Sequence, residues 1–292
     1  GPVLWFESES SARDCTGRNA LAAAIEILRT GGILALKGLG GYQLLCNATN
    51  AAAVKRLREK KHRHSKPLAV MIPESMRPNS HVVPSKVGHE PEEKVWNSPA
   101  NPIVIFEIPA NPIRIAHSVG RTEAAANAGT AQTDSPVATV CSHHQSTVKA
   151  EVPAALRFAR SGLLACAHCM LAIGPDVHPG LNSIGIMLPT TPLHALLLNG
   201  MQTPLVVTSG NRDAEPLAFD ELAARTSLAG IADGWLHHDR NIERPIDDSV
   251  VRLIAGHIVT IRAARGIAPL RLPFQTRHSI LAVGGEQKVA CA

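Results

Sequence analysis

Two short polar motifs, far apart in the chain, each adjoin an apolar segment. The Lys-His-Arg motif at 61–63 ends a basic segment that we predict to be helical, and the Ser-Lys-Pro motif at 65–67 leads into the apolar run 67–72. The Thr-Ser-Gly-Asn motif at 208–211 follows a second apolar run, 204–207. Fixed cations neutralise phosphate oxygens, while Ser, Asn and Gly let the backbone approach and orient them. We expect both apolar runs to be strands of one sheet with both motifs at the same edge, where α/β proteins bind ligands.

Helical and strand-like patterns are interspersed along the rest of the chain. The hydrophobic content of 45% in 292 residues is enough for a sizeable core. A helix capped by Thr49 or Asn50 should end near Lys61. The other predicted helices cover 18–30, 91–97, 152–172, 191–198 and 220–227, and the predicted strands cover 33–36, 42–46, 67–72, 103–106, 183–188, 204–208, 248–254 and 257–262. This mixture, which includes a hairpin at its end, predicts an α/β protein with a mixed β-sheet flanked by helices.

Charge and cysteine content narrow the class of protein. The six cysteines are scattered and nothing resembles a secretory signal, so we expect a reducing, cytoplasmic location. No apolar run approaches the about 20 residues of a membrane span, so no membrane partner is expected. The segment from Lys55 to Lys66 contains seven Lys and Arg residues, and Glu59 is its only acidic residue. Such a run is a solvated helix face, a nucleic-acid patch or a phosphate cradle.

Residues 114–175 differ in amino-acid composition from the segments around them. They include a stretch rich in Ala, Thr, Asn and Gly without periodicity, which predicts an insertion with one helix at 152–172. Cys166 and Cys169 have the spacing of zinc ligands, and Cys141 with His143 could complete a set of four. The alternative is that these are incidental residues of a poorly constrained loop.

Six stretches of the sequence, which follow one another in the same order as in the family, resemble one known family. They are 33–50 (ILALKGLGGYQLLCNATN), 57–72 (LREKKHRHSKPLAVMI), 98–105, 180–198 (GLNSIGIMLPTTPLHALLL), 204–216 (PLVVTSGNRDAEP) and 247–269. They are similar to the YrdC-like domain of HypF, the carbamoyltransferases that make the cyanide ligands of NiFe-hydrogenase. The resemblance implies a YrdC-like/RibB-like twisted mixed β-sheet flanked by helices. It also implies a linker over 1–17 after an absent zinc-finger region, a YrdC-like domain over 18–273 with the insertion, and the start of a truncated kinase-like domain over 274–292.

The resemblance implies a reaction as well. Carbamate, derived from carbamoyl phosphate, and ATP with Mg²⁺ would give carbamoyl-adenylate and pyrophosphate, and a HypE-type protein would accept the carbamoyl group. Two alternatives stay open. The same fold serves enzymes that make threonylcarbamoyl-adenylate for tRNA modification. The family has also been described as binding double-stranded RNA. A protein that recognises RNA by its shape contacts phosphates and 2′-hydroxyls with basic side chains.

Matching the family pattern residue by residue gives the expected site. Two anions must meet and the leaving pyrophosphate must be neutralised, which requires cations. The catalytic role falls on Lys61 and Arg63, which we expect to be solvent-facing cations at a helix end whose replacement leaves the fold intact. The implied nucleotide- and phosphate-binding residues are Lys66, Ser209, Asn211, Ser249, Arg262 and Arg265, and the implied substrate pocket comprises Lys37, Gly40, Gly41, Tyr42 and His194.

Two positions depart from the family pattern. Gln43 stands where HypF proteins typically carry His, and Asn47 stands where they typically carry Asp. If either family residue positions substrate by its charge, the activity of this chain depends on how the replacement acts.

Overall fold

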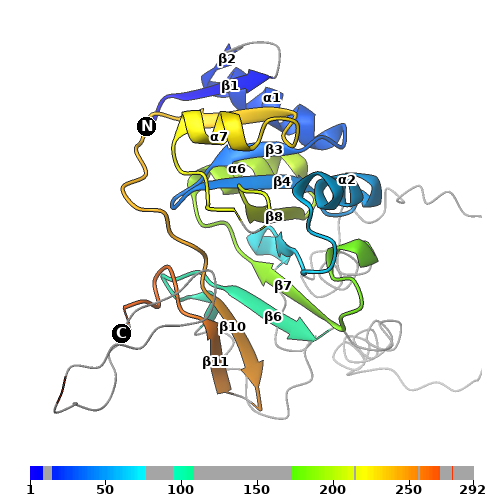
Figure 1. Ribbon diagram of the computed structural model, residues 1–292, viewed down its shortest axis with the longest axis vertical. Coiled ribbons are helices and arrows are strands. Elements are labelled where there is room, and N and C mark those ends of the chain that lie inside the picture. The colour runs from blue at the N-terminus through cyan, green and yellow to red at the C-terminus, as the bar shows by residue number, and fades with distance from the viewer. Residues whose placement is uncertain are drawn as a thin grey trace, which may run out of the picture.

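The computed structural model describes residues 1–8, 15–76, 95–107, 173–213, 215–255, 257–269 and 278. These residues form a sheet of 11 strands in the order β11-β10-β6-β7-β5-β8-β4-β3-β9-β1-β2 (Figure 1). The pairs β3–β9, β5–β7 and β6–β10 are parallel, and the remaining neighbours are antiparallel. The predicted α/β class with a mixed sheet is confirmed.

The elements have the following bounds. The strands are β1 (Leu4–Ser8), β2 (Cys15–Thr16), β3 (Leu34–Lys37), β4 (Tyr42–Asn47), β5 (Ala69–Met71), β6 (Ile103–Glu107), β7 (Ser183–Met187), β8 (Leu205–Ser209), β9 (Gly234–His238), β10 (Val250–Ile254) and β11 (His257–Arg262). The helices are α1 (Gly17–Arg29), α2 (Ala51–Lys61), α6 (Pro192–Met201) and α7 (Glu221–Ser227), with short 3₁₀ turns η1 (Glu74–Met76) and η3 (Pro175–Val177).

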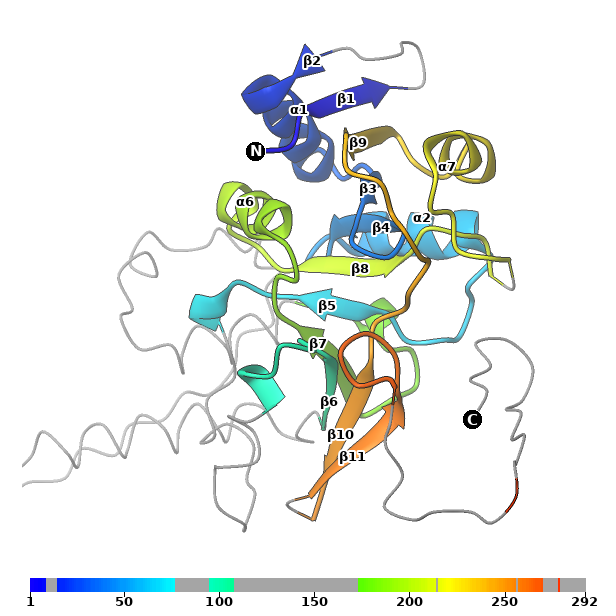
Figure 2. The same ribbon diagram turned by 90° about the vertical axis from the view of Figure 1, so that its left-hand side faces the viewer.

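Helices cover both faces of the sheet because successive strand residues point to opposite sides. In β3, Leu34 and Leu36 pack in the cluster that contains the buried residues of α1 and α6. Ala35 packs in the other cluster, with the buried residues of α2 and α7. Figure 2 shows α1 and α6 on one side of the sheet and α2 and α7 on the other. Apolar burial on both faces therefore stabilises the central strands.

Side-chain caps fix where three of the helices begin. Asn50 Oδ1 accepts from Ala53 N at 3.1 Å, which selects Asn50 rather than Thr49 as the cap of α2. Thr191 Oγ1 caps α6 in the same way, and Asp220 caps α7. Each cap satisfies an N–H that the helix itself leaves without a partner.

The expectation of a linker over residues 1–17 is wrong for its strand-forming part. Strand β1 pairs antiparallel with β9, and Trp5 and Phe6 are buried. Neither strand was predicted. The sequence of β9, Gly-Trp-Leu-His-His, looks polar at its end, yet His237 is fully buried. Its Nδ1 lies 2.7 Å from the Tyr42 hydroxyl, and its Nε2 lies 3.3 Å from Glu7 Oε2, so polar partners within the fold let this histidine occupy a core position that a polarity pattern assigns to solvent.

Several expectations concern residues outside the described ranges and stay predictions. They are the insertion up to residue 172 with its helix at 152–172, the zinc candidates Cys141, His143, Cys166 and Cys169, most of the helix at 91–97, and residues 274–292 apart from His278. The last part of the expected insertion is described, and Ile173 is buried in the core.

Neither a cluster of metal ligands nor a membrane-spanning helix is found among the described residues. In that part of the chain, no group of three or more His, Cys, Asp and Glu residues is arranged to hold a metal ion. Its helices also lack the combination of length and apolar character that crossing a bilayer requires.

Candidate functional site

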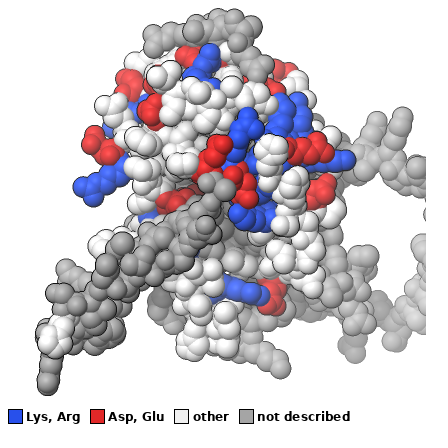
Figure 3. All heavy atoms as spheres, in the orientation of Figure 1, with Lys and Arg blue, Asp and Glu red and all other residues white. Residues whose placement is uncertain are grey.

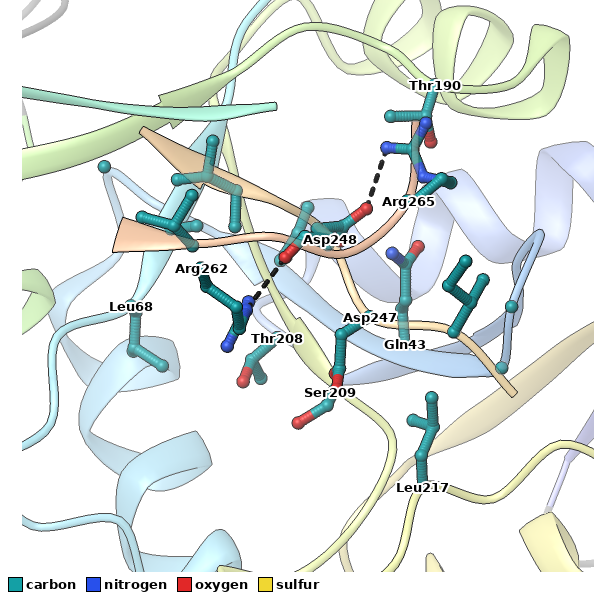
Figure 4. A pocket seen from close by; sticks show the side chains of 18 of the residues that line it. Gln43, Leu68, Thr190, Thr208, Ser209, Leu217, Asp247, Asp248, Arg262 and Arg265 are labelled. Atoms are coloured by element: carbon teal, nitrogen blue, oxygen red, sulfur yellow. Dashed lines mark hydrogen bonds and ion pairs between the residues drawn. The ribbon is translucent and has the colours of Figure 1, made fainter. Parts of the chain in front are cut away.

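A cavity of about 260 Å³ lies on the face of the sheet that also packs α1 and α6. Its floor crosses neighbouring strands, from Gln43 of β4 and Val207 of β8 through Ala69 of β5 to Gly185 of β7. A Cβ added to Gly185 would lie 2.9 Å from Ile103 Cγ2, so the floor has no room for a side chain there. Polar side chains and charged loops form the walls (Figure 4). The cavity is thus an apolar trough with a polar rim.

Three arginines line this cavity: Arg63, Arg262 and Arg265. The loop before β10 orients two of them. Arg262 Nε donates to the backbone oxygen of Asp248 at 2.9 Å, and Arg265 Nη2 donates to Asp248 Oδ1 at 2.8 Å (Figure 4). Guanidinium groups bind carboxylates and phosphates through paired N–H donors. The wall therefore suits an anionic ligand.

Arg63 reaches the cavity from the segment between α2 and β5. The helix ends at Lys61, and the left-handed backbone of its C-cap His62 (φ 55°) turns the chain toward the sheet. Arg63 Nη2 donates to the oxygen of Pro67 at 2.7 Å, which holds the side chain against its own loop. Burial lowers the pKa of Arg63, and Asp213 opposes that effect. The group remains a cation at neutral pH, because arginine is effectively always protonated in proteins.

Arg58 organises the loop that carries Arg63. Its side chain is buried, and its Nη1 donates to the oxygens of Arg63 at 2.9 Å and Lys66 at 3.0 Å. Its remaining nitrogens donate to the backbone oxygens of Asp176 and Val177. One guanidinium therefore joins α2, the 63–66 loop and η3 into a single unit.

We expect Arg58→Met to lower the free energy of unfolding by about 3 kcal/mol. Four backbone carbonyls in buried or part-buried positions would lose a donor, and an unsatisfied buried group costs about 1–3 kcal/mol before relaxation. Chemical denaturation measures the change. Lys55→Met, at an exposed position of the same helix, is the matched control and should stay within about 0.5 kcal/mol of the wild type. Equal stability of the two variants would contradict the organising role of Arg58.

The two polar motifs meet where neighbouring strands of the sheet begin and end, as predicted. Strands β5 and β8 are antiparallel neighbours with Ala69 opposite Val207, so the start of one lies beside the end of the other. Lys61 Nζ donates to Asn211 Oδ1 at 2.8 Å, which joins the motifs directly.

The environment of Lys61 differs from expectation, because its side chain is only 1% exposed rather than facing solvent. Its ammonium group donates to the backbone oxygens of Ser209, at 2.5 Å, and Asn211, besides the Asn211 side chain. An ammonium group has three N–H donors. These three oxygens engage all of them, so in this structure Lys61 shapes the turn after β8 and does not line the cavity.

That turn requires its glycine. Gly210 N donates to the oxygen of Tyr42 at 2.7 Å, and a Cβ at this position would lie 2.6 Å from the same oxygen. Ser209 Oγ donates to Asn211 Oδ1 at 2.7 Å, and Asn211 Nδ2 donates to the oxygen of Glu215 at 2.5 Å. Ser209 lines the cavity, while Asn211 braces the turn behind it.

The predicted site residues divide into two groups. Those that line the cavity are Gly40, Gly41, Tyr42, Arg63, Ser209, Arg262 and Arg265. Those that the structure places outside its lining are Lys37, Lys61, Lys66, His194, Asn211 and Ser249.

Three members of the second group have structural partners instead. Lys37 Nζ lies 3.3 Å from Glu221 Oε1 and donates to the oxygen of His238 at 3.0 Å. Ser249, directly before β10, is fully buried, and its hydroxyl donates to the oxygen of Arg265 at 3.0 Å and accepts from Ala264 N at 2.9 Å. Lys66 Nζ contacts both carboxylate oxygens of Asp213 at 3.0 Å. The predicted pocket role of Lys37 and phosphate role of Ser249 therefore lack geometric support.

The rest of the basic segment lies at the surface. Figure 3 shows Lys and Arg side chains gathered over α2 with acidic groups between them. Lys55 is exposed, and Arg56 forms an ion pair with Asp233. The seven cations of segment 55–66 therefore lie in three environments. Arg58 and Lys61 are buried, Arg63 lines the cavity, and the others lie at the surface.

Sequence reasoning missed Asp247 and Asp248, which line the cavity beside the arginines. Asp248 is the first residue of the predicted strand 248–254 and Asp247 directly precedes it, so their position at the start of a strand was the available signal. Gln43, noted only as a departure, lines the cavity too.

Two buried histidines predict how stability depends on pH. Burial, aided by Arg265, lowers the pKa of His194 to about 4, and burial also lowers the pKa of His237 to about 4. An unfolded histidine titrates near pH 6.5, so between about pH 6.5 and 4 the unfolded state binds more protons and stability falls as pH falls. We expect each histidine to cost roughly 1–2 kcal/mol between pH 7 and 5.

Urea denaturation at pH 7 and pH 5 measures this loss. His194→Gln should lose less stability on acidification than the wild type, whereas His64→Gln, at an exposed position, should lose as much. Identical losses in the wild type and His194→Gln would contradict the neutral, buried state of His194.

The profile of the Sua5/YciO/YrdC family, described as "Telomere recombination", matches residues 26–140 and 134–264. This chain belongs to the Sua5/YciO/YrdC family. One curated relative of this chain is the "Carbamoyltransferase HypF" of Synechocystis sp.. It is 34% identical over 271 residues, which cover 92% of this chain and 27% of the relative. The HypF of Rhodobacter capsulatus is 34% identical over 99% of this chain and 30% of its own length. The chain therefore spans less than a third of these relatives.

Solved structures agree with this assignment. Full-length HypF in a phosphate- and nucleotide-bound form matches this chain with a TM-score of 0.64 and 28% identity. The match covers 96% of this chain and 28% of HypF. The P. abyssi Sua5 complexed with L-threonine has a TM-score of 0.54 and 16% identity, over 86% of this chain and 56% of Sua5. The second match shows the shared fold alone, and the predicted YrdC-like architecture is confirmed.

Proposed function

We propose that this cavity binds ATP and carbamate and forms carbamoyl-adenylate, as one step of carbamoyl transfer in hydrogenase maturation. The observation that carries the proposal is the convergence of Arg63, Arg262 and Arg265 with Ser209 around one cavity. Two anions can react there because fixed cations offset their mutual repulsion. The relatives named carbamoyltransferase support the choice of substrate, and the nucleotide- and phosphate-bound HypF supports the choice of ligand class.

In this proposal a carbamate oxygen attacks the α-phosphorus of ATP. The new bond joins that oxygen to phosphorus, and the bond from phosphorus to the bridging oxygen of the β-phosphate breaks. Its electron pair leaves with pyrophosphate. Arg63 can hold a carboxylate-like group or a phosphate through two N–H donors, and the other two arginines offset charge on the phosphates. No protein nucleophile is required, because positioning and electrostatics supply the acceleration.

Mg²⁺ would accompany ATP, and the residues present fit such an ion. Mg²⁺ is usually held by one or two carboxylates together with substrate phosphates. Asp247 and Asp248 supply carboxylates on the cavity wall, although Asp248 also holds Arg265. The ion would offset phosphate charge, in the same sense as the arginines.

The surrounding steps belong to the proposal too. Carbamate would come from carbamoyl phosphate, and the carbamoyl group would pass to a HypE-type acceptor. Double-stranded RNA binding on the exposed face of α2 is the non-enzymatic alternative. Threonylcarbamoyl-adenylate synthesis is the enzymatic one.

Product analysis separates these functions. The chain is incubated with ATP and Mg²⁺ plus either ammonium carbamate or threonine with bicarbonate, and adenylates are identified by mass spectrometry. We expect carbamoyl-adenylate from the first mixture. Threonylcarbamoyl-adenylate from the second would support the synthase alternative. Neither product, together with retention of double-stranded RNA, would support the binding module and overturn the proposal.

A further inference from the structure

Gln43 and Thr190 both line the cavity, and the buried side chain of His194 joins them. Figure 4 shows the Gln43 side chain extending from β4 toward Arg265 and Thr190. Its Oε1 lies 2.9 Å from Nε2 of His194, which is fully buried. The other ring nitrogen, His194 Nδ1, lies 3.0 Å from Thr190 Oγ1. The three side chains form one continuous line of hydrogen bonds.

The chemistry of these groups fixes the direction of each bond. An amide oxygen can only accept, so His194 Nε2 must carry a proton and donate it to Gln43. Burial keeps His194 neutral, so its Nδ1 has no proton and accepts from the Thr190 hydroxyl. The amide oxygen is thereby tied to the protein interior. The two N–H donors of the same amide then point away from His194.

The surrounding backbone reinforces this orientation. A Cβ added to Gly38 would lie 3.2 Å from Gln43 Oε1, so the turn after β3 packs closely against the amide. Gly38 N donates to the oxygen of Gly41 at 2.9 Å, which closes that turn. Among the described residues, the Gln43 amide nitrogen has no hydrogen-bond partner. An oriented donor on the cavity floor is therefore available to a ligand.

We propose that Gln43 is a specificity-determining residue, which donates from its amide nitrogen to an oxygen of the small carboxylate-like substrate, and that His194 and Thr190 position it. This inference rests on the proposed function for the identity of the substrate. An amide donor favours an oxygen acceptor without adding charge, whereas the arginines attract any anion. A site built to hydrogen-bond one atom discriminates strongly against ligands that lack that atom.

Three variants test the proposal. Gln43→Glu keeps an oxygen for His194 but turns a second oxygen toward the substrate, and Gln43→Met keeps the length without any polar atom. His194→Phe leaves Gln43 in place but removes the group that orients it. Each is measured for KM and kcat with carbamate and with ATP. Because a hydrogen bond to a charged group is lost, we expect the KM for carbamate to rise about 10-fold or more in both Gln43 variants.

The KM for ATP should change less than about 2-fold in the same variants, which separates a substrate contact from general damage to the site. His194→Phe should raise the carbamate KM by a smaller factor. An unchanged carbamate KM in Gln43→Glu and Gln43→Met, or equal changes in the KM values for both substrates, would overturn the inference.

A binding measurement keeps this test independent of turnover. ¹³C-bicarbonate, which shares the charge and shape of carbamate, is observed by NMR line broadening with the wild type and Gln43→Glu. Broadening in the wild type that is lost in Gln43→Glu supports the contact even if no adenylate forms, in which case only the proposed function fails. Equal broadening in both proteins, or none in the wild type, overturns the Gln43 inference.

Discussion

Replacing Arg63 with alanine should reduce kcat/KM for adenylate formation by a factor of about 100 or more while leaving the protein folded. Arg63 lines the cavity, and within the described part of the chain its side chain donates to backbone oxygens of its own loop. Removing one preorganised donor from a site where charge develops typically costs about 100- to 1000-fold in rate. The stability change should stay below about 1 kcal/mol, because no buried cavity opens. Pyrophosphate release measures the rate, and chemical denaturation measures the stability.

Two controls sharpen this prediction. Arg63→Lys keeps the charge but loses the two-pronged geometry, so an intermediate rate is expected. Lys55→Ala removes an exposed cation of the same segment and should leave the rate unchanged. Near-normal turnover of Arg63→Ala would remove Arg63 from the site.

Lys61→Met should lose both activity and stability. The substitution leaves three oxygens around a buried position without their donor, so we expect the free energy of unfolding to fall by about 2–4 kcal/mol. This differs from the expectation based on sequence, which placed Lys61 in solvent and predicted an intact fold. Denaturation and turnover are measured on the same preparation. An inactive Lys61→Met as stable as the wild type would show that Lys61 acts on the substrate and not through the turn.

The contrast between these two residues shows what the sequence could predict. The spacing of Lys61 and Arg63 placed both at the end of one helix, and the apolar runs placed both motifs on strands. Which side chain turns inward depends on the tertiary packing of α2 beside the turn after β8. That packing joins residues 150 positions apart, and no local pattern encodes it.

Strand parity could have corrected one site prediction. Cross-strand partners share a face of the sheet. Leu36, which packs in the cluster on the cavity face, pairs with Gln43, whereas Lys37 pairs with Tyr42, whose side chain packs in the cluster on the other face. Lys37 is therefore directed away from the cavity face. This argument needs the register of β3 against β4, which the sequence leaves open.

The helices that could be predicted from sequence share a physical reason. Asn50, Thr191 and Asp220 are side-chain caps placed directly before helical patterns. Such local signals act over a few residues, so they can be recognised without tertiary structure. Strand β9 has no comparable signal, because its buried histidine depends on Tyr42, which is 195 positions away.

Exchange of labelled pyrophosphate into ATP tests the central claim most directly, because it reports reversal of adenylate formation and needs no acceptor protein. The account predicts that the wild-type chain incorporates label only when carbamate is present and that Arg63→Ala does not. Incorporation that is independent of carbamate, or none from a folded chain that binds ATP, would contradict it.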